Sequence, residues 1–155
     1  IKTVIEQFYP ICIEFEGSKL ALTYHEKESL TKYLTESLCG VDKHSELVCL
    51  ESVMLYDGGR DGMNAEAFHA HCDGHDNTLS LIETNFEHIF GIFSPHRWDQ
   101  SQNRYLEGNG SFLCVIRSKF EQVECPKCCR YTEDGAYAKY GPYAGSGFGP
   151  CIGHP

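Results

Sequence analysis

The clearest helical pattern in this chain lies between residues 26 and 39. Leu30, Leu34 and Leu38 are spaced four residues apart, so they fall on one face of a helix, and mostly polar residues fill the positions between them. Gly40 follows this stretch and favours the end of a helix. The pattern predicts a helix over residues 26–39 with one apolar face.

A second, shorter helix is predicted over residues 65–72. Asn64 precedes it and is favourable there, because an Asn side chain accepts a hydrogen bond from a free backbone N–H of the first turn. Gly74 follows two residues after Cys72, where glycine commonly ends a helix. This helix therefore has a start signal and a stop signal.

The remaining apolar stretches are short and bounded by turn residues, which is typical of strands. We expect strands over residues 3–8, 11–16, 48–56, 78–82, 88–93 and 111–116. The stretch 48–56 is mostly apolar and runs into Asp57-Gly58-Gly59, which indicates a buried strand and a tight turn. Residues 121–155 hold six of the fifteen glycines and four of the six prolines, so a loop-rich segment is expected. Together these elements predict an α+β domain whose sheets are mostly antiparallel.

The charge balance narrows the class of partner. The 155 residues include 13 Lys and Arg against 22 Asp and Glu, a net charge of -9 that repels phosphate backbones and anionic lipids. No apolar stretch approaches the roughly 20 residues that cross a bilayer. We therefore expect neither a nucleic-acid partner nor insertion into a membrane.

The cysteines indicate a reduced environment. There are nine of them, an odd number without regular spacing, in a chain whose 41% hydrophobic content is enough to build one core without disulfides. We expect most of them to be reduced, buried and part of a cytoplasmic protein.

The densest group of metal-ligating residues is a histidine-rich segment at residues 69–76. His71 and His75 would share one helix face at the spacing of a metal site, but Gly74 between them should end the helix and turn His75 away. We therefore expect Cys72 to lie in the core and the histidines, His69 included, to form a polar surface.

A second candidate is a CxxC pair formed by Cys125 and Cys128, which is half of a zinc site. Cys151 and His154 are the downstream residues that complete four ligands. A loop with reduced thiols is the favoured interpretation, so no metal and no cofactor is expected. Zinc binding and a reversible disulfide stay open as alternatives.

The acidic segment 57–62 resembles the start of a calcium-binding loop, but Phe68 stands at its twelfth position, where a bidentate Glu is required. We interpret Arg60, Asp61 and Gly62 instead as a turn. In it Gly62 takes a conformation that glycine favours, while Arg60 and Asp61 pair with buried polar groups or with each other.

Several short motifs occur in a fixed order along the middle of the chain. They are Leu55-Tyr56 with Arg60-Asp61-Gly62, Phe68 with Cys72-Asp73, Gly91 and Trp98, Ser111-Phe112-Leu113, and Gly141-Pro142 with Gly145 and Gly147. In this order they resemble the landmarks of TLDc domains, over residues 28–149. The sequence departs from the pattern at four places. Cys114 stands where a second Phe is usual, Ile92 where a second Gly is usual and Gly58 where Ser is usual, and Pro150-Cys151 occupies the place of an expected Asp.

The resemblance implies a fold and a function. Residues 26–155 would form a TLDc-like domain, a β-sandwich of two antiparallel sheets flanked by a few helices, with residues 1–25 as an N-terminal extension or edge strands. It implies a non-enzymatic eukaryotic adaptor linked to oxidative-stress resistance. Such an adaptor would dock on a large assembly such as the vacuolar-type proton pump (V-ATPase). No catalytic residues are implied.

Two other classes of function remain open from the sequence. One is a structural component of a cytoskeletal or ciliary, microtubule-associated complex. The other is a zinc-stabilised module or a metal-dependent enzyme that uses the histidine and cysteine clusters. For an adaptor, we expect the contact surface on the loops before Trp98 and after Cys114, because binding residues concentrate on loops held by a rigid scaffold.

Overall fold

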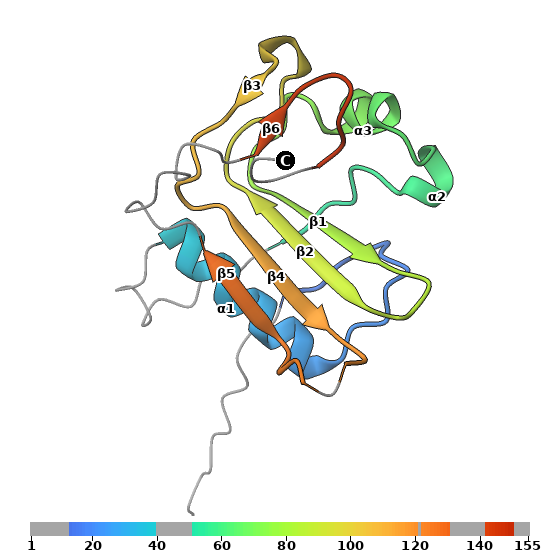
Figure 1. The fold of residues 1–155 in the computed structure, drawn as a ribbon, viewed down its shortest axis with the longest axis vertical. Coiled ribbons are helices and arrows are strands. Elements are labelled where there is room, and N and C mark those ends of the chain that lie inside the picture. The colour runs from blue at the N-terminus through green and yellow to red at the C-terminus, as the bar shows by residue number, and fades with distance from the viewer. Residues whose placement is uncertain (1–12, 40–50, 121, 131–141, 151–155) are drawn as a thin grey trace, which may run out of the picture.

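The computed structural model describes residues 13–39, 51–120, 122–130 and 142–150, and the structural statements below concern these residues. Helices and strands follow one another along the chain as labelled in Figure 1. They are α1 (Tyr24–Cys39), α2 (Gly58–Asp61), α3 (Ala65–Cys72), β1 (Thr78–Glu83), β2 (Ile89–Ser94), the 3-10 turn Gln100–Gln102, β3 (Arg104–Tyr105), β4 (Phe112–Arg117), β5 (Lys127–Arg130) and β6 (Tyr143–Ala144).

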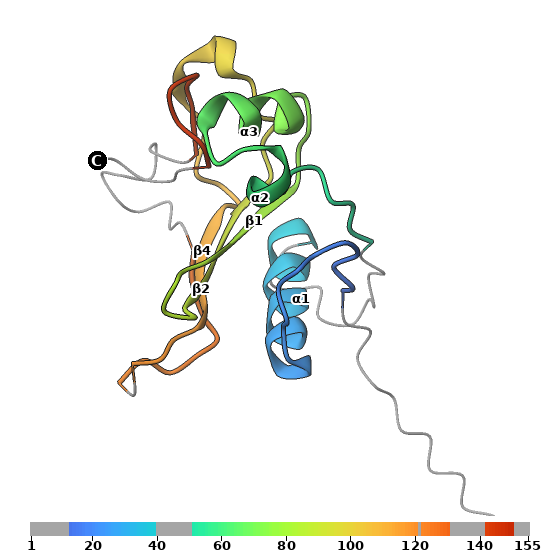
Figure 2. The same cartoon turned by 90° about the vertical axis from the view of Figure 1, so that its right-hand side faces the viewer.

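The strands form two antiparallel sheets. The larger has the order β1-β2-β4-β5, and the smaller consists of β3 and β6. Figures 1 and 2 show the small sheet and α3 beyond one end of the large sheet, while α1 lies against one of its faces. The predicted α+β class with two antiparallel sheets is confirmed.

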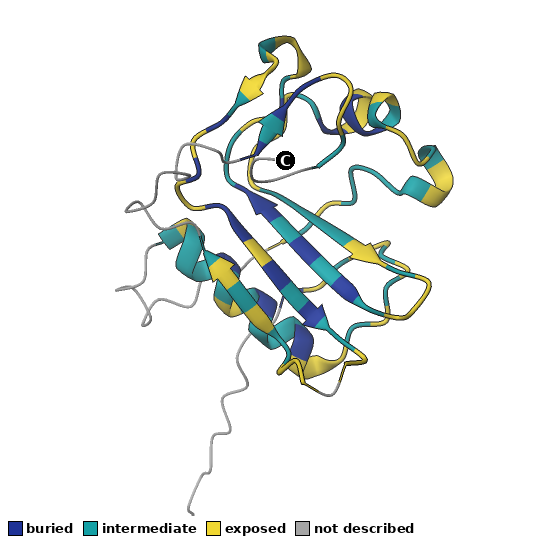
Figure 3. Ribbon diagram, in the orientation of Figure 1, coloured by how far each residue is buried: buried dark blue, intermediate teal, exposed yellow. Residues whose placement is uncertain are grey.

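The core lies between α1 and the central strands, where burial alternates along β4 as the pleat requires. Leu30 and Leu34 of α1 are buried, as the helical spacing predicts, and they pack in one cluster with Phe93 and Phe112. The rings of Phe93 and Phe112 stack at 5.1 Å between centroids. Figure 3 shows many of the buried residues on β2, on β4 and on parts of α1. Each such side chain stabilises the fold by about 1.5–3 kcal/mol.

Helix α1 begins with a reciprocal cap. Thr23 N–H donates to Glu26 Oε2 at 2.7 Å, and Glu26 N–H donates to Thr23 Oγ1 at 3.3 Å, which satisfies two free donors of the first turn. The Glu26 carboxylate also accepts hydrogen bonds from Arg117 of β4, at 2.7 Å from both Nε and Nη2. Burial raises the pKa of Glu26, but the hydrogen bonds from Arg117 and Thr23 outweigh it and hold the pKa below its ordinary value.

A second arginine binds the other half of α1 to the sheet. Arg130 of β5 donates to Glu36 at 2.6 Å, to Ser37 Oγ at 2.7 Å and to the Tyr33 carbonyl at 3.1 Å. Its guanidinium also lies 5.6 Å from the centre of the Phe112 ring, a cation–π contact. Helix α1 is therefore tied to the sheet near both ends.

The predicted strand at 48–56 is wrong over its described part. Residues 51–56 form no strand, Val53 is 81% exposed, and only an isolated bridge joins Glu51 to Glu14. Leu55 and Tyr56 pack instead against the buried cluster of Phe68, Cys72 and Trp98. Contact with helix α3 thus covers these apolar side chains, and no neighbouring strand is needed. The rest of that stretch and residues 3–8 lie outside the described residues. Of the predicted strand 11–16, residues 13–16 are described, and their strand pairing is limited to the isolated bridge between Glu14 and Glu51.

The loop-rich prediction for the tail missed two strands, β5 and β6. The register of β5 places Cys128 opposite Cys114 and Arg130 opposite Phe112. The strand forms because β4 offers an unpaired edge, which no local pattern reveals. The turn predicted at Asp57-Gly58-Gly59 likewise continues into a single helical turn, α2.

We expect Gly91→Ala to destabilise the protein by about 1–3 kcal/mol, because the register of β2 and β4 leaves no room for a side chain there. A Cβ at Gly91 would lie 2.7 Å from Cys114 Sγ and 3.3 Å from Ile116 Cδ1. Urea unfolding followed by circular dichroism measures the effect. Gly147→Ala is the control, since nothing lies within 4 Å of its added Cβ. Adding Cys114→Ala to Gly91→Ala should recover part of the loss, and no recovery would contradict the steric explanation.

We expect Glu26→Gln to cost about 1–3 kcal/mol of unfolding free energy at neutral pH, through loss of the ion pair with Arg117. The folded-state pKa of Glu26 lies below its ordinary value of 4.5, so the pair's contribution is complete above that pH and is lost as the pH falls further. The gap between wild type and variant should therefore close in acid. Urea unfolding of both proteins across this range measures it, and a gap independent of pH would contradict this role.

Candidate functional site

The motif residues Arg60, Asp61 and Gly62 form a turn that organises the approach to α3. Arg60 donates to Asp61 from Nε at 2.6 Å and from Nη2 at 2.7 Å, so the two side chains pair with each other as one of the predicted alternatives states. Asp61 also accepts from the Asp57 backbone N–H at 2.9 Å, and the hydrogen bonds from Arg60 and Asp57 hold its pKa far below the usual range. Gly62 has φ 108°, which confirms the predicted conformation. Tyr56 closes the turn by donating to the Gly62 carbonyl at 2.6 Å.

Helix α3 carries the next motif and builds a second small core. Asn64 caps it as predicted, accepting from Ala67 N–H at 2.8 Å. Phe68 meets the Trp98 ring edge-on at 5.3 Å, and Cys72 completes the buried cluster. Burial raises the pKa of Cys72 to about 11, so this thiol is a core residue rather than a nucleophile, as expected.

His69 departs from the sequence expectation, which placed it on a polar surface. Its side chain is fully buried; Nδ1 lies 2.7 Å from Asp73 Oδ1, and Nε2 lies 3.0 Å from the Gly145 carbonyl and 2.8 Å from the Phe148 carbonyl. The ring thus joins α3 to a segment more than seventy residues later in the chain. Sequence reasoning missed this because only the fold brings the two segments together, and a buried polar ring needs such partners.

Asp73 extends the same polar contact toward Trp98. Its Oδ2 accepts from the Gln100 backbone N–H at 3.0 Å, and the Asp73 backbone forms an isolated bridge with Trp98. Trp98 Nε1 donates to Thr78 Oγ1 of β1 at 2.7 Å. The motif residues of this region therefore hold α3, the 3-10 turn and β1 in one arrangement.

The structure describes the ligands of the first predicted metal site fully and those of the second only in part. Near α3, His71 and His75 are exposed, and no group of three possible ligands converges anywhere in the described ranges. Cys128 lies in β5, where burial raises its pKa to about 11, and Cys125 lies in the loop before it. Cys151 and His154 lie outside the described residues, so the zinc alternative stays a prediction.

The remaining motif residues and cysteines occupy the core and its edges. Gly91, Ser111, Phe112 and Pro142 are buried, whereas Gly141 lies outside the described residues.

The six described cysteines, all free thiols, are Cys39, Cys72, Cys114, Cys125, Cys128 and Cys129. Cys72 and Cys114 are buried, Cys129 is exposed and the others are half-buried, so burial is less general than the sequence indicated.

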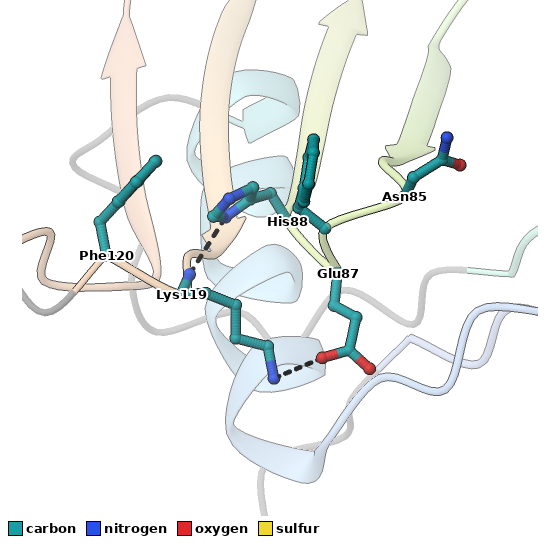
Figure 4. A pocket seen from close by; sticks show the side chains of 6 residues that line it. Asn85, Glu87, His88, Lys119 and Phe120 are labelled. Atoms are coloured by element: carbon teal, nitrogen blue, oxygen red, sulfur yellow. Dashed lines mark hydrogen bonds and ion pairs between the residues drawn. The ribbon is translucent and has the colours of Figure 1, made fainter.

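An open pocket of about 520 Å³ lies at the end of the large sheet remote from α3, between the β1–β2 turn and the segment after β4 (Figure 4). The lining residues are Asn85, Phe86, Glu87, His88, Lys119 and Phe120. Phe86 is 76% exposed and Phe120 is 68% exposed. The His88 ring stacks on Phe120 with 4.9 Å between centroids. Two large aromatic side chains thus face solvent beside one pocket.

Two side chains of the β1–β2 turn hold the walls of the pocket by accepting hydrogen bonds from backbone N–H groups. Thr84 Oγ1 accepts from the N–H groups of Phe86, at 3.3 Å, and of His88, at 3.2 Å. His88 Nδ1 in turn accepts from the Lys119 N–H at 3.0 Å, which links the turn to the segment after β4. Lys119 Nζ lies 2.8 Å from Glu87 Oε2 at the border of the pocket, and that hydrogen bond lowers the pKa of Glu87. The β1–β2 turn and the segment after β4, which form the two walls of the pocket, are therefore joined to each other.

Sequence reasoning singled out neither Phe86 nor Phe120. The signal available was an aromatic residue inside a turn, in Thr84-Asn85-Phe86-Glu87, because turns between strands are usually polar. The predicted contact surface was the loop before Trp98 and the loop after Cys114. Strand β4 continues past Cys114 to Arg117, and Phe120 lies in the segment that follows.

Comparison with known families identifies the family to which most of the chain belongs. The family model of the TLDc domain matches residues 18–154. The chain belongs to the TLDc domain family. Neither a curated protein nor a solved structure matched significantly. In this TLDc domain, the described helices include none that is long and apolar enough to cross a bilayer.

We expect His69→Ala to cost about 2–4 kcal/mol of unfolding free energy, because it removes the ring contacts with Asp73 and with the carbonyls of Gly145 and Phe148 and opens a cavity where the buried ring was. Limited proteolysis should also show faster cleavage within residues 142–150. His75→Ala is the control, since His75 is exposed. Equal stability of the two variants would contradict the role of His69 as a tie between α3 and that segment.

Proposed function

We propose that this TLDc domain is a non-enzymatic interaction module that docks on a protein of a larger assembly through the aromatic pocket. The exposed pair Phe86 and Phe120 carries this proposal. Leaving two Phe side chains in water is unfavourable, and aromatic residues are enriched at the centres of protein interfaces. Contact with a partner would remove this cost.

The rigidity of the pocket supports the same function. The side chains of Thr84 and His88 hold the β1–β2 turn and the segment after β4 in one geometry by accepting hydrogen bonds from backbone N–H groups. A preformed site loses less conformational entropy when it binds. Glu87 takes φ 61°, a conformation uncommon for residues other than glycine, so the turn is held in a specific shape.

The contacts of His69 support a role without catalysis. His69 and Asp73 form the kind of pair that activates a nucleophile in hydrolases. Here, however, the other ring nitrogen faces two backbone carbonyls and the ring is fully buried, so no substrate atom reaches it. The pair serves structure, and we propose that the domain has no enzymatic activity and no cofactor.

The partner that we propose is a subunit of the vacuolar-type proton pump, in a cytoplasmic complex linked to oxidative-stress resistance. This choice rests on the TLDc family, and the net charge of -9 favours a partner with a basic surface. A cytoskeletal complex is the alternative partner.

Affinity capture from eukaryotic cell extract tests the proposal, with quantitative mass spectrometry as the readout. We expect wild-type protein to capture pump subunits at near-stoichiometric yield. The double variant Phe86→Ser with Phe120→Ser should lose them at least tenfold, because truncating interface anchors costs about 2 kcal/mol or more each.

The control for that capture is Val53→Ser with Met63→Ser, which removes two apolar side chains that are 81% and 86% exposed and lie outside the pocket. Its capture should equal that of wild type. Recovery of cytoskeletal proteins in place of pump subunits would favour the alternative partner. Recovery of no stoichiometric partner by wild type would overturn the proposed function.

A further inference from the structure

Pairing between strands β4 and β5 places two cysteines directly opposite each other. They are Cys114 of β4 and Cys128 of β5, which are partners in the antiparallel register. Opposite residues in such a ladder have Cα atoms about 4.5–5.5 Å apart, and their side chains lie on the same face. A disulfide bond needs Cα atoms roughly 4.4–6.8 Å apart. The two backbones therefore already have the spacing that this bond requires.

Both thiols lie on the face of the sheet that α1 covers. Cys114 is 1% exposed and belongs to the main core cluster, and the half-buried Cys128 packs against that cluster. Burial, and after it the nearby Cys128 thiol, raises the pKa of Cys114 to about 12. Cys129 is exposed and lies on the opposite face, because successive side chains of a strand alternate. Cys128 is therefore the strand neighbour that can reach Cys114.

Rotation of one side-chain bond separates this arrangement from a disulfide. The Sγ atom of Cys114 lies toward β2, 3.6 Å from the Gly91 carbonyl oxygen. Gly91 is the register partner of Cys114 on β2, and Cys128 is its register partner on β5. A change of χ1 from one staggered position to another turns Sγ of Cys114 away from β2 and toward β5. The backbone does not have to move.

We propose that Cys114 and Cys128 are a redox pair that closes into a reversible disulfide bond when the protein meets hydrogen peroxide. The more accessible Cys128 sulfur attacks the peroxide first, which gives a sulfenic acid and one molecule of water. The Cys114 sulfur then attacks the Cys128 sulfur. The hydroxide that leaves takes the proton of the Cys114 thiol and becomes a second water. Two thiols are thereby oxidised, and one hydrogen peroxide is reduced to two waters.

The bond would fasten the edge of the large sheet. Strand β5 is the last in the order β1-β2-β4-β5, and four residue pairs join it to β4 (Figure 1). The closed loop runs from Cys114 to Cys128 and includes Phe120 of the aromatic pocket. Closing a loop stabilises the fold by restricting the unfolded chain. This effect goes beyond the proposed docking function and does not depend on it.

Peptide mapping by mass spectrometry tests the pairing. Folded wild-type protein is treated with hydrogen peroxide, the remaining thiols are alkylated, and the protein is digested without reduction. We expect a cross-linked peptide that contains Cys114 and Cys128 and that dithiothreitol converts back to two free thiols. Cys72 is the internal control, because it is buried in the separate α3 cluster and its pKa is likewise raised, to about 11. It should stay reduced at the dose that links the pair.

Thermal unfolding followed by circular dichroism measures the effect of the bond. Oxidised wild type should melt about 5–10 °C above the reduced protein, as closing a loop of this length predicts. Cys114→Ala and Cys128→Ala should each abolish this rise. Cys125→Ser is the matched control and should keep both the cross-link and the rise. If Cys114→Ala does not fold, the variant at the half-buried Cys128 still decides the outcome.

Three results would overturn the inference. The first is a disulfide that joins Cys128 to Cys125 or to Cys129. The second is a Cys114 thiol that stays reduced while Cys128 is oxidised to sulfinic acid. The third is a link between Cys114 and Cys128 that forms only in urea, because the folded ladder would then not bring the two thiols together. Partner capture is a separate measurement, so the docking function stands or fails independently of these results.

Discussion

Two arginines bind helix α1 to the large sheet, and the rest of the structure depends on this contact. Arg117 reaches Glu26 at the first turn, and Arg130 reaches Glu36 near the last. The carboxylates are largely buried, with 8% and 14% of each side chain exposed, so removing one partner leaves a poorly solvated charge. Between the pairs, the apolar face of α1 covers the central strands. The helix thereby fixes which face of the sheet is core.

With that face covered, the two ends of the sheet take different roles. At one end, the buried rings of His69 and Trp98 bind α3 to the glycine-rich segment and to β1 through hydrogen bonds. At the other, the β1–β2 turn and the segment after β4 expose Phe86 and Phe120 beside a pocket. The first end stabilises the fold. The second presents apolar surface on a preorganised frame, which is what a docking site requires.

Local patterns predicted the elements whose signals are local. The helix 26–39, the cap at Asn64 and the turn at Gly62 follow from spacing, capping chemistry and backbone preference, and the structure has all three. The strand predicted at 48–56 is wrong over residues 51–56, because an apolar run does not say which element will cover it. Strand β5 was missed because pairing with β4 creates it, and a sequence of four half-polar residues carries no such signal.

The sequence by itself determined the class of fold and the family, because hydrophobic spacing, turn residues and an ordered set of short motifs are properties of neighbouring residues. The tertiary structure alone decided what the polar and aromatic residues do. His69 is buried because Gly145 and Phe148 come to it from the far end of the chain, and Phe86 borders a pocket because Phe120 lies across from it. Convergence of distant segments is set by packing, which no local pattern encodes.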